Sequence, residues 1–290
     1  MTQIDKSRFE WIGSDSARRE GISRPSTTFW KDAIGRLMKN KVAVVCFFII
    51  VLLILSCIIV PFFSPFESRE QHLGEVNKGF MTVCTDSRYE GQHHVHYFGT
   101  DNLGRDLFLR AFEGGRVSLM IAFAAVFVNL IVGLIYGGIS GYIGGAVDTI
   151  MMRIVEIVNG IPYLIVVILL MMVLPKGIFT MVVAYGITGW TGMARLVRGQ
   201  VLQLKSQEYI VAAEAMGAKS SRIIAKHLIP NALSVIIINV TLAIPSAIFT
   251  EAFLSYIGLG VPVPQPSWGV LAKGGQDVFM TYPYQLVVPA

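Results

Sequence analysis

Five runs of the sequence contain no Asp, Glu, Lys or Arg, and each is long enough to cross a membrane as a helix. They cover residues 42–60, 117–147, 157–175, 177–194 and 228–250. A helix rises about 1.5 Å per residue, so about 20 apolar residues span the hydrocarbon core, where only helices and closed barrels satisfy their backbone hydrogen bonds. Because the apolar runs are continuous, they indicate helices. The expected fold class is all-α, a polytopic transmembrane helical bundle.

Composition and charge agree with a membrane protein. The chain is 53% hydrophobic and 15% charged, whereas soluble domains carry about a quarter charged residues. The first run follows a polar segment without a small-residue cleavage site, which argues against a secretory signal. Basic residues directly before it (Arg36, Lys39 and Lys41) place the N-terminus in the cytoplasm by the positive-inside rule. Residues 61–116 are then outside and residues 195–227 inside. We attribute the net charge of +5 to basic residues on the inner face, where they meet anionic lipid, and we expect no nucleic-acid partner.

The segment before the first run has two open interpretations. Phe29, Trp30, Ile34, Leu37 and Met38 recur at helical spacing among basic residues. This pattern suits an amphipathic helix lying on the inner surface, and it suits a helical extension of the first span equally well.

Two groups of residues are weighed as sites and judged structural. His93, His94 and His96 resemble a metal-ligand cluster, but a solvated loop is favoured, and Cys46, Cys57 and Cys84 lack metal-ligand spacing, so no metal is expected. Glu156 and Glu251 lie near the ends of runs, where we interpret them as membrane-interface residues.

The inner segment at residues 208–231 predicts a short helix, a glycine turn and a second helix. Ala212, Ala213 and Ala215 favour a helix, and Gly217 can adopt the left-handed conformation that ends it. We expect Ser220 or Ser221 to cap the next helix and Pro230 to close it. Small side chains and a flexible Met216 suit insertion into a partner's groove. A DNA-binding helix-turn-helix has the same outline, but the flanking spans argue against it.

This segment resembles the coupling motif of ABC importer permeases, in which Glu-Ala-Ala is followed after three residues by Gly and later by Leu-Pro. Ala212, Ala213 and Gly217 match, whereas Val211 replaces the first Glu and Ile229 precedes Pro230 in place of Leu. The resemblance implies an ATPase-coupling role for Ala212, Ala213, Glu214, Ala215, Met216, Gly217, Ile229, Pro230 and Asn231.

Other stretches resemble the second permease of the oligopeptide, dipeptide and nickel importer group. They include 96–106 (HYFGTDNLGRD), 115–119, 141–145 with Asp148 and 152–153, 194–200, 254–260 and 266–269. The signature residues carried over are Phe98, Gly99, Thr100, Asp101, Gly104, Arg105, Asp106, Arg116, Arg195 and Arg198. For Asp101, Arg105 and Asp106 we favour a structural role over substrate contact, since charge-assisted hydrogen bonds can tie the outer loop to the second span.

The resemblance implies the type I ABC importer permease fold, with five spans visible of an expected six and an apparent truncation at the C-terminus. The expected organisation is a cytoplasmic tail (1–41), a first transmembrane helix (42–61), an extracytoplasmic loop (62–114) and a permease domain (115–290) containing the coupling loop (195–232).

The function implied is a permease subunit carrying oligopeptides or dipeptides across a bacterial inner membrane. The partners implied are a second homologous permease, two cytoplasmic ATPases, an extracytoplasmic binding protein and lipid. The sequence has no Gly-x-x-x-x-Gly-Lys-Ser/Thr loop, so ATP and Mg²⁺ are assigned to the ATPases, and this chain is expected to hold no cofactor and to have no enzyme activity.

The alternative functions are a nickel or other small-solute permease and an ATPase-independent channel or secondary transporter. An intramembrane enzyme is disfavoured because the runs hold no His, Asp or Glu to activate a nucleophile.

Overall fold

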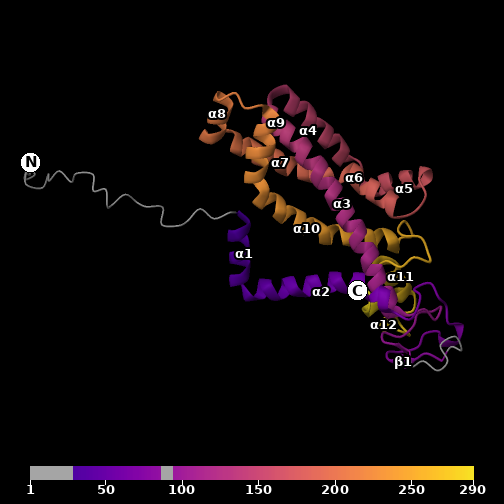
Figure 1. The fold of residues 1–290 in the computed structure, drawn as a ribbon. Helices are drawn as coiled ribbons and strands as arrows, with labels where there is room; N and C mark the ends of the chain where they lie inside the picture. Colours follow the sequence, from indigo (N-terminus) through magenta and orange to yellow (C-terminus); the bar gives the residue numbers. More distant parts are fainter. Residues whose placement is uncertain (1–28, 86–93) are drawn as a thin grey trace, which may run out of the picture. The chain divides into compact units, whose positions relative to one another are not determined.

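The computed structural model describes residues 29–85 and 94–290, and the chain divides into two units, residues 1–53 and 54–290. The first unit contains α1 (Phe29–Lys39) and the first part of α2 (Lys41–Phe63), with Asn40 between the two helices, and Figure 1 shows a sharp bend there. Asn40 separates the two helices: its side-chain oxygen accepts a hydrogen bond from the Ala43 amide at 3.3 Å, as an N-cap does. The segment before the first span is therefore a separate helix and not an extension of that span.

In the second unit, the long helix α3 (Leu107–Ile143) packs along α7 (Trp190–Lys205) through a row of glycines. A Cβ atom at Gly133 would lie 2.5 Å from the Met193 side chain, and one at Gly137 would lie 2.3 Å from the Ala194 carbonyl oxygen. Only glycine allows the two backbones to approach this closely. Small residues serve this purpose in membranes, where apolar burial alone does not drive helices together.

Three helical segments of the described chain are long and apolar enough to cross a membrane: Lys41–Phe63, Leu107–Ile143 and Ser220–Tyr256. A fourth is possible if α4 (Gly145–Gly160) and α5 (Tyr163–Val173), which meet at a bend of 79°, count as one span. The predicted third run therefore begins inside α4 and does not form one straight helix. Pro162 lies at the bend, where its missing N–H and fixed φ interrupt a helix.

The predicted fourth span, 177–194, is not a single helix. α6 (Ile178–Thr188) has only 11 residues, and α7 begins after Gly189. A Cβ atom at Gly189 would lie 2.4 Å from the side-chain nitrogen of Asn129 on α3. The close approach of α3 at this point requires glycine, and the apolar run is divided there.

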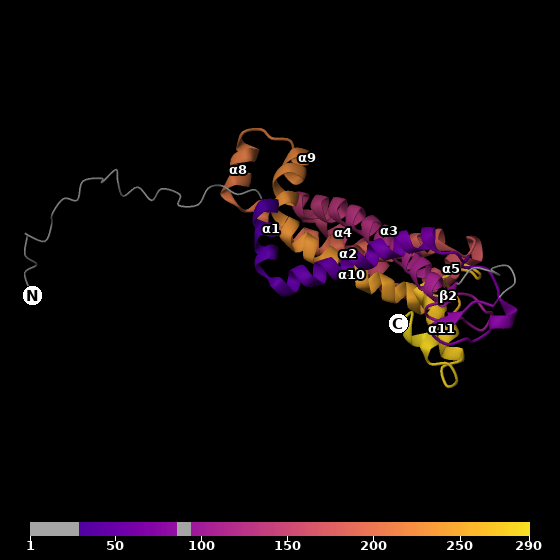
Figure 2. The same ribbon diagram turned by 60° about the horizontal axis from the view of Figure 1, so that its bottom comes forward.

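The remaining elements gather at the two ends of α3, as Figures 1 and 2 both show. At one end lie α8 (Glu208–Ala215), α9 (Ser220–Ile223) and the start of α10 (Ile229–Tyr256). At the other end lie α11 (Trp268–Asp277), α12 (Tyr284–Val287) and residues 64–85 and 94–106, which we call the loop subdomain. Within its described residues, the loop subdomain contains a 3-10 helix (Leu73–Glu75) and the antiparallel strands β1 (Thr82–Val83) and β2 (Val95–His96), with Thr82 opposite His96.

Candidate functional site

The predicted helix, glycine turn and helix are present at the α8 end of the molecule. α8 ends at Ala215, and Gly217 has a φ of +77°. The Gly217 amide donates to the Glu214 carbonyl at 2.9 Å, and the Ala218 amide donates to the Ala213 carbonyl at 3.1 Å. These two bonds are the Schellman arrangement that satisfies carbonyls at a helix end. The prediction that Gly217 ends this helix in a left-handed conformation is confirmed.

The buried face of α8 packs on α7 and on the residues beyond the turn. Ile210 belongs to one apolar core with Val197 and Val201 of α7, and with Ile223 and Leu228 beyond the turn. Ala213 is buried on the same face. Full burial of an Ile or Leu side chain stabilises by about 1.5–3 kcal/mol, so this core holds the short helix firmly on α7.

The opposite face of α8 and the turn are open to a partner. The Met216 side chain is 82% exposed, and Tyr209 and Val211 are also exposed large apolar side chains. Ala212, Glu214 and Ala215 are exposed as well. The part of the predicted coupling motif that precedes Ala218 therefore forms a projecting surface of small and apolar side chains.

Polar contacts connect this surface to the end of α3. The Tyr142 hydroxyl donates to the Glu214 carboxylate at 3.0 Å, and the Lys205 ammonium donates to the Tyr142 carbonyl at 2.5 Å. The same ammonium lies 5.2 Å from the centre of the Tyr142 ring, within the range of a cation–π contact. Tyr142 thus joins α3, α7 and α8, a link that the sequence pattern did not indicate.

The predictions that a serine caps the second helix and that Pro230 closes it are wrong. Lys219 and not a serine occupies the N-cap of α9, without a side-chain cap, and the chain continues through a π-helical turn, Ile224–Leu228, directly into α10. Pro230 lies in the first turn of α10 and does not close a helix. In an α-helix its ring would clash with the carbonyl four residues earlier, and the wider π turn directly before it gives this carbonyl more room. Ile229 and Asn231 therefore lie in the first turn of α10, inside the helical segment Ser220–Tyr256, and the Asn231 side chain donates to the His227 carbonyl at 2.6 Å.

Two of the signature residues, Arg195 and Arg198, lie on α7. The Arg198 guanidinium donates twice to the Asp148 carboxylate of α4, from Nε to Oδ1 and from Nη2 to Oδ2, both at 2.5 Å. Ser140 of α3 donates to the same carboxylate at 2.5 Å. A bidentate guanidinium–carboxylate pair fixes orientation as well as distance, so Arg198 holds α4 against α7 and α3. Arg195 is exposed.

Asp101, Arg105 and Asp106 lie at the other end of α3 and form a buried hydrogen-bonded group. The Asp101 carboxylate accepts from the Arg105 side chain at 2.7 Å and from the amides of Leu103 and Arg105. Asp106 is the N-cap of α3 and accepts from the Leu109 amide at 2.7 Å. This arrangement is the one expected for a structural connection between the loop subdomain and α3.

His96 is buried and not solvated, contrary to the expectation from the sequence. Its Nδ1 lies 2.7 Å from the Asp106 carboxylate and its Nε2 lies 2.9 Å from the Glu75 carboxylate. Burial alone would lower the pKa of His96, but the hydrogen bonds and negative charges of Asp106 and Glu75 raise it above its ordinary value. His94 is half-buried, and His93 lies outside the described residues.

The other signature residues shape the backbone around this group. Gly99 and Gly104 have φ values of +76° and +73°, and a Cβ atom at Gly104 would lie 2.0 Å from the His72 carbonyl oxygen. The Thr100 hydroxyl donates to the Glu75 carbonyl. Phe98 packs on Phe108 with ring centres 5.0 Å apart. Arg116 takes no part in this group. It is partly exposed, and its guanidinium forms a long ion pair with the Glu113 carboxylate at 3.8 Å.

Glu251, interpreted from its sequence position as a membrane-interface residue, is buried among protein side chains. Its carboxylate is 1% exposed and accepts from Ser118 of α3 at 2.6 Å and from Ser255 at 2.7 Å. The amide of Trp268, the first residue of α11, donates to the same Ser118 hydroxyl. Glu251 therefore joins α10, α3 and α11. Glu156, by contrast, is exposed beside Arg153.

Comparisons with known proteins agree with this architecture. A family model described as "Binding-protein-dependent transport system inner membrane component" matches residues 129–288, and one described as "N-terminal TM domain of oligopeptide transport permease C" matches residues 28–79. Among solved structures, the MetNI methionine ABC transporter in an inward-facing conformation matches with a TM-score of 0.51 and 21% identity, over 63% of this chain and 87% of that chain. At this level of identity the match shows the fold alone.

Curated relatives match over nearly the whole chain. The oligopeptide transport system permease protein OppC of Bacillus subtilis (strain 168) is 48% identical over 100% of this chain and 91% of its own length. The dipeptide transport system permease protein DppC of the same organism is 45% identical over 93% and 81%, and OppC of Escherichia coli (strain K12) is 41% identical over 99% and 91%. The chain therefore belongs to the family of binding-protein-dependent transport system inner membrane components, and its fold is that of the type I ABC importer permeases.

Proposed function

We propose that this chain is a permease subunit of an ATP-driven importer for oligopeptides or dipeptides. The relatives that match over nearly its full length are named as oligopeptide and dipeptide permeases, which supports this substrate class over nickel. On this proposal the chain lies in a bacterial inner membrane with its N-terminus in the cytoplasm. It works with a second homologous permease, two ATPases that hold ATP and Mg²⁺, and an extracytoplasmic binding protein.

The observation that carries the proposal is the projecting surface of α8 and Gly217. It presents Met216 and small side chains outward, while Ile210 packs in one core with side chains of α7 and Ala213 is buried. A short rigid helix with an apolar tip suits a groove on a partner. Closure of the ATPases would move this helix, and the firm attachment to α7 would pass the movement to the spans.

Reconstitution tests the substrate and the need for partners. Proteoliposomes containing both permeases, the ATPases and the binding protein should accumulate a labelled peptide when ATP is supplied, and should not accumulate labelled nickel. Uptake by this chain without ATPases would contradict the proposal and favour a channel or a secondary transporter. Nickel uptake in place of peptide uptake would contradict the substrate assignment alone.

Cross-linking tests the coupling surface separately. A Met216→Cys variant should form a cross-link to an ATPase subunit in the assembled complex. The matched control is Val263→Cys, which is also strongly exposed but lies in the segment between α10 and α11, at the opposite end of α10. Equal cross-linking of both variants to the ATPases, or none from Met216→Cys, would contradict the coupling role.

A further inference from the structure

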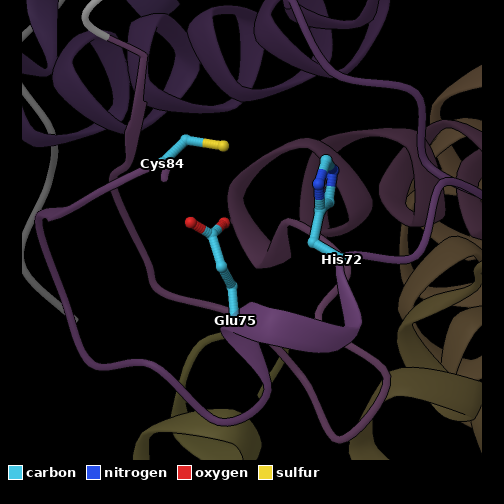
Figure 3. A group of neighbouring side chains, drawn as sticks. All are labelled: His72, Glu75 and Cys84. Carbon is cyan, nitrogen blue, oxygen red and sulfur yellow. The ribbon is translucent and has the colours of Figure 1, made fainter. Parts of the chain in front are cut away.

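Three side chains with metal-binding atoms converge inside the loop subdomain. His72 precedes the 3-10 helix Leu73–Glu75, Glu75 is its last residue, and Cys84 directly follows β1. One ligand atom from each lies within 4.8 Å of the other two, and the residues are 2%, 2% and 7% exposed. Figure 3 shows the Glu75 carboxylate and the Cys84 sulfur pointing into the space beside the His72 ring. The sequence alone argued against such a site because Cys84 has no cysteine partner at ligand spacing.

The donor set indicates which ions fit. An imidazole nitrogen, a thiol sulfur and a carboxylate oxygen are the ligands of zinc and of neighbouring divalent transition metals, whereas calcium and magnesium take oxygen ligands. With metal–ligand bonds of about 2.0–2.3 Å, tetrahedral ligand atoms lie about 3.3–3.8 Å apart. The ligand atoms of His72, Glu75 and Cys84 lie within 4.8 Å of one another, so binding an ion would draw them together by about 1 Å. Three protein ligands leave a fourth position for water.

The surrounding residues already hold the ligands in place. The Glu75 carboxylate accepts hydrogen bonds from the amide and the hydroxyl of Thr85 and lies 2.9 Å from Nε2 of His96. On the backbone, Gly104 packs against the His72 carbonyl, and Thr100 donates to the Glu75 carbonyl. In known metal sites, such contacts around the ligands hold them in the orientation that binds the metal. The signature segment thus supports two of the three candidate ligands.

We propose that His72, Glu75 and Cys84 form a binding site for a zinc-class divalent metal ion, independent of the substrate that the importer carries. On binding, the sulfur–hydrogen bond of Cys84 breaks, its electron pair forms the sulfur–metal bond, and the proton leaves to solvent. No oxidant or reductant is required. The bound ion joins the 3-10 helix to the residue after β1, and so fixes the loop subdomain that caps α3.

The first test is metal content and spectroscopy of the complete, metal-stripped importer complex in detergent. After equilibration with zinc and removal of excess, mass spectrometry should find one zinc more per chain in the wild type than in Cys84→Ser or His72→Gln. With cobalt(II) in place of zinc, the wild type should show a thiolate-to-cobalt charge-transfer band that Cys84→Ser lacks. The affinity of either variant should fall by about 10- to 100-fold or more.

Cys46→Ser is the matched control, because Cys46 is an exposed thiol on α2. This variant should keep the wild-type zinc content and the cobalt band. Equal zinc content in the wild type, Cys84→Ser and His72→Gln would overturn the proposal, as would a cobalt band that survives Cys84→Ser. If Cys84→Ser does not assemble, His72→Gln decides, since loss of one zinc supports the site and retention refutes it. Peptide uptake is not the readout, so failure of the site and failure of the transport proposal remain distinguishable.

Discussion

Replacement of Gly217 by valine should uncouple transport while leaving the protein in the membrane. A Cβ atom at Gly217 meets nothing within 4 Å, so no steric clash is involved, and the effect comes from the backbone, whose φ is +77°. An L-residue pays about 1–2 kcal/mol in the left-handed region, and a β-branched residue lies at the upper end. That cost lowers the population of the left-handed turn by about 5- to 30-fold relative to backbone conformations in which residue 217 has a negative φ.

The assay is ATP-dependent uptake of a labelled peptide, normalised to the amount of assembled complex. Gly217→Val should lose at least nine-tenths of uptake, and Gly217→Asn should keep most of it because asparagine tolerates the left-handed region. Gly35→Val is the matched control: Gly35 lies in α1, also has open space around its Cβ position, and has no left-handed φ. Normal uptake by a well-assembled Gly217→Val variant would refute the reasoning.

Three further substitutions test the buried contacts. Glu251→Ala should destabilise the detergent-solubilised protein by about 2–4 kcal/mol, because it leaves a cavity and removes the acceptor of two buried hydroxyls; Glu156→Ala, an exposed glutamate near the end of a run, should change the melting temperature little, and equal effects would contradict the burial. Arg198→Ala and Asp148→Ala should each cost about 1–2 kcal/mol and should not be additive in a double-mutant cycle, whereas additive losses would show that the bidentate pair contributes nothing. Gly104→Ala should expose the loop subdomain to limited proteolysis, because its Cβ would collide with the His72 carbonyl at a left-handed φ, while Gly79→Ala meets open space and should resist as the wild type does.

Local sequence signals predicted the α8 turn correctly. A run of strong helix formers followed by Gly217 specifies a helix end through short-range backbone preferences alone. The same kind of reasoning failed at Pro230, because proline is compatible with the first turn of a helix as well as with its end. The π turn before Pro230, together with the packing of Leu228 and Ala232 into the core beneath α8, decided between them.

Hydrophobic runs identified the spanning regions but not their breaks. The need for glycine at position 189 comes from the approach of Asn129 from α3, a contact between residues 60 positions apart that no local pattern records. Burial of Glu251 likewise depends on Ser118 and on the amide of Trp268. Sequence position alone therefore could not separate Glu251 from Glu156.

The loop subdomain was the least predictable part, because its sequence has no period and its structure rests on long-range contacts. His72, Glu75 and His96 meet only when the chain folds back on itself, and the signal available was the pair of glycines at Gly99 and Gly104. A left-handed glycine marks a close backbone approach but does not say which segment approaches.

The glycine-lined contact between α3 and α7 has a geometric consequence. Two helices whose backbones touch cannot slide past each other without opening voids, so they tilt as one body. α3 has 37 residues, and at 1.5 Å per residue it is a rod about 55 Å long, so that a tilt of about 5° at the α8 end displaces the Asp106 end by about 5 Å. The residues that cap α3 there would travel with it, and the two faces of the membrane would be linked by one rigid axis.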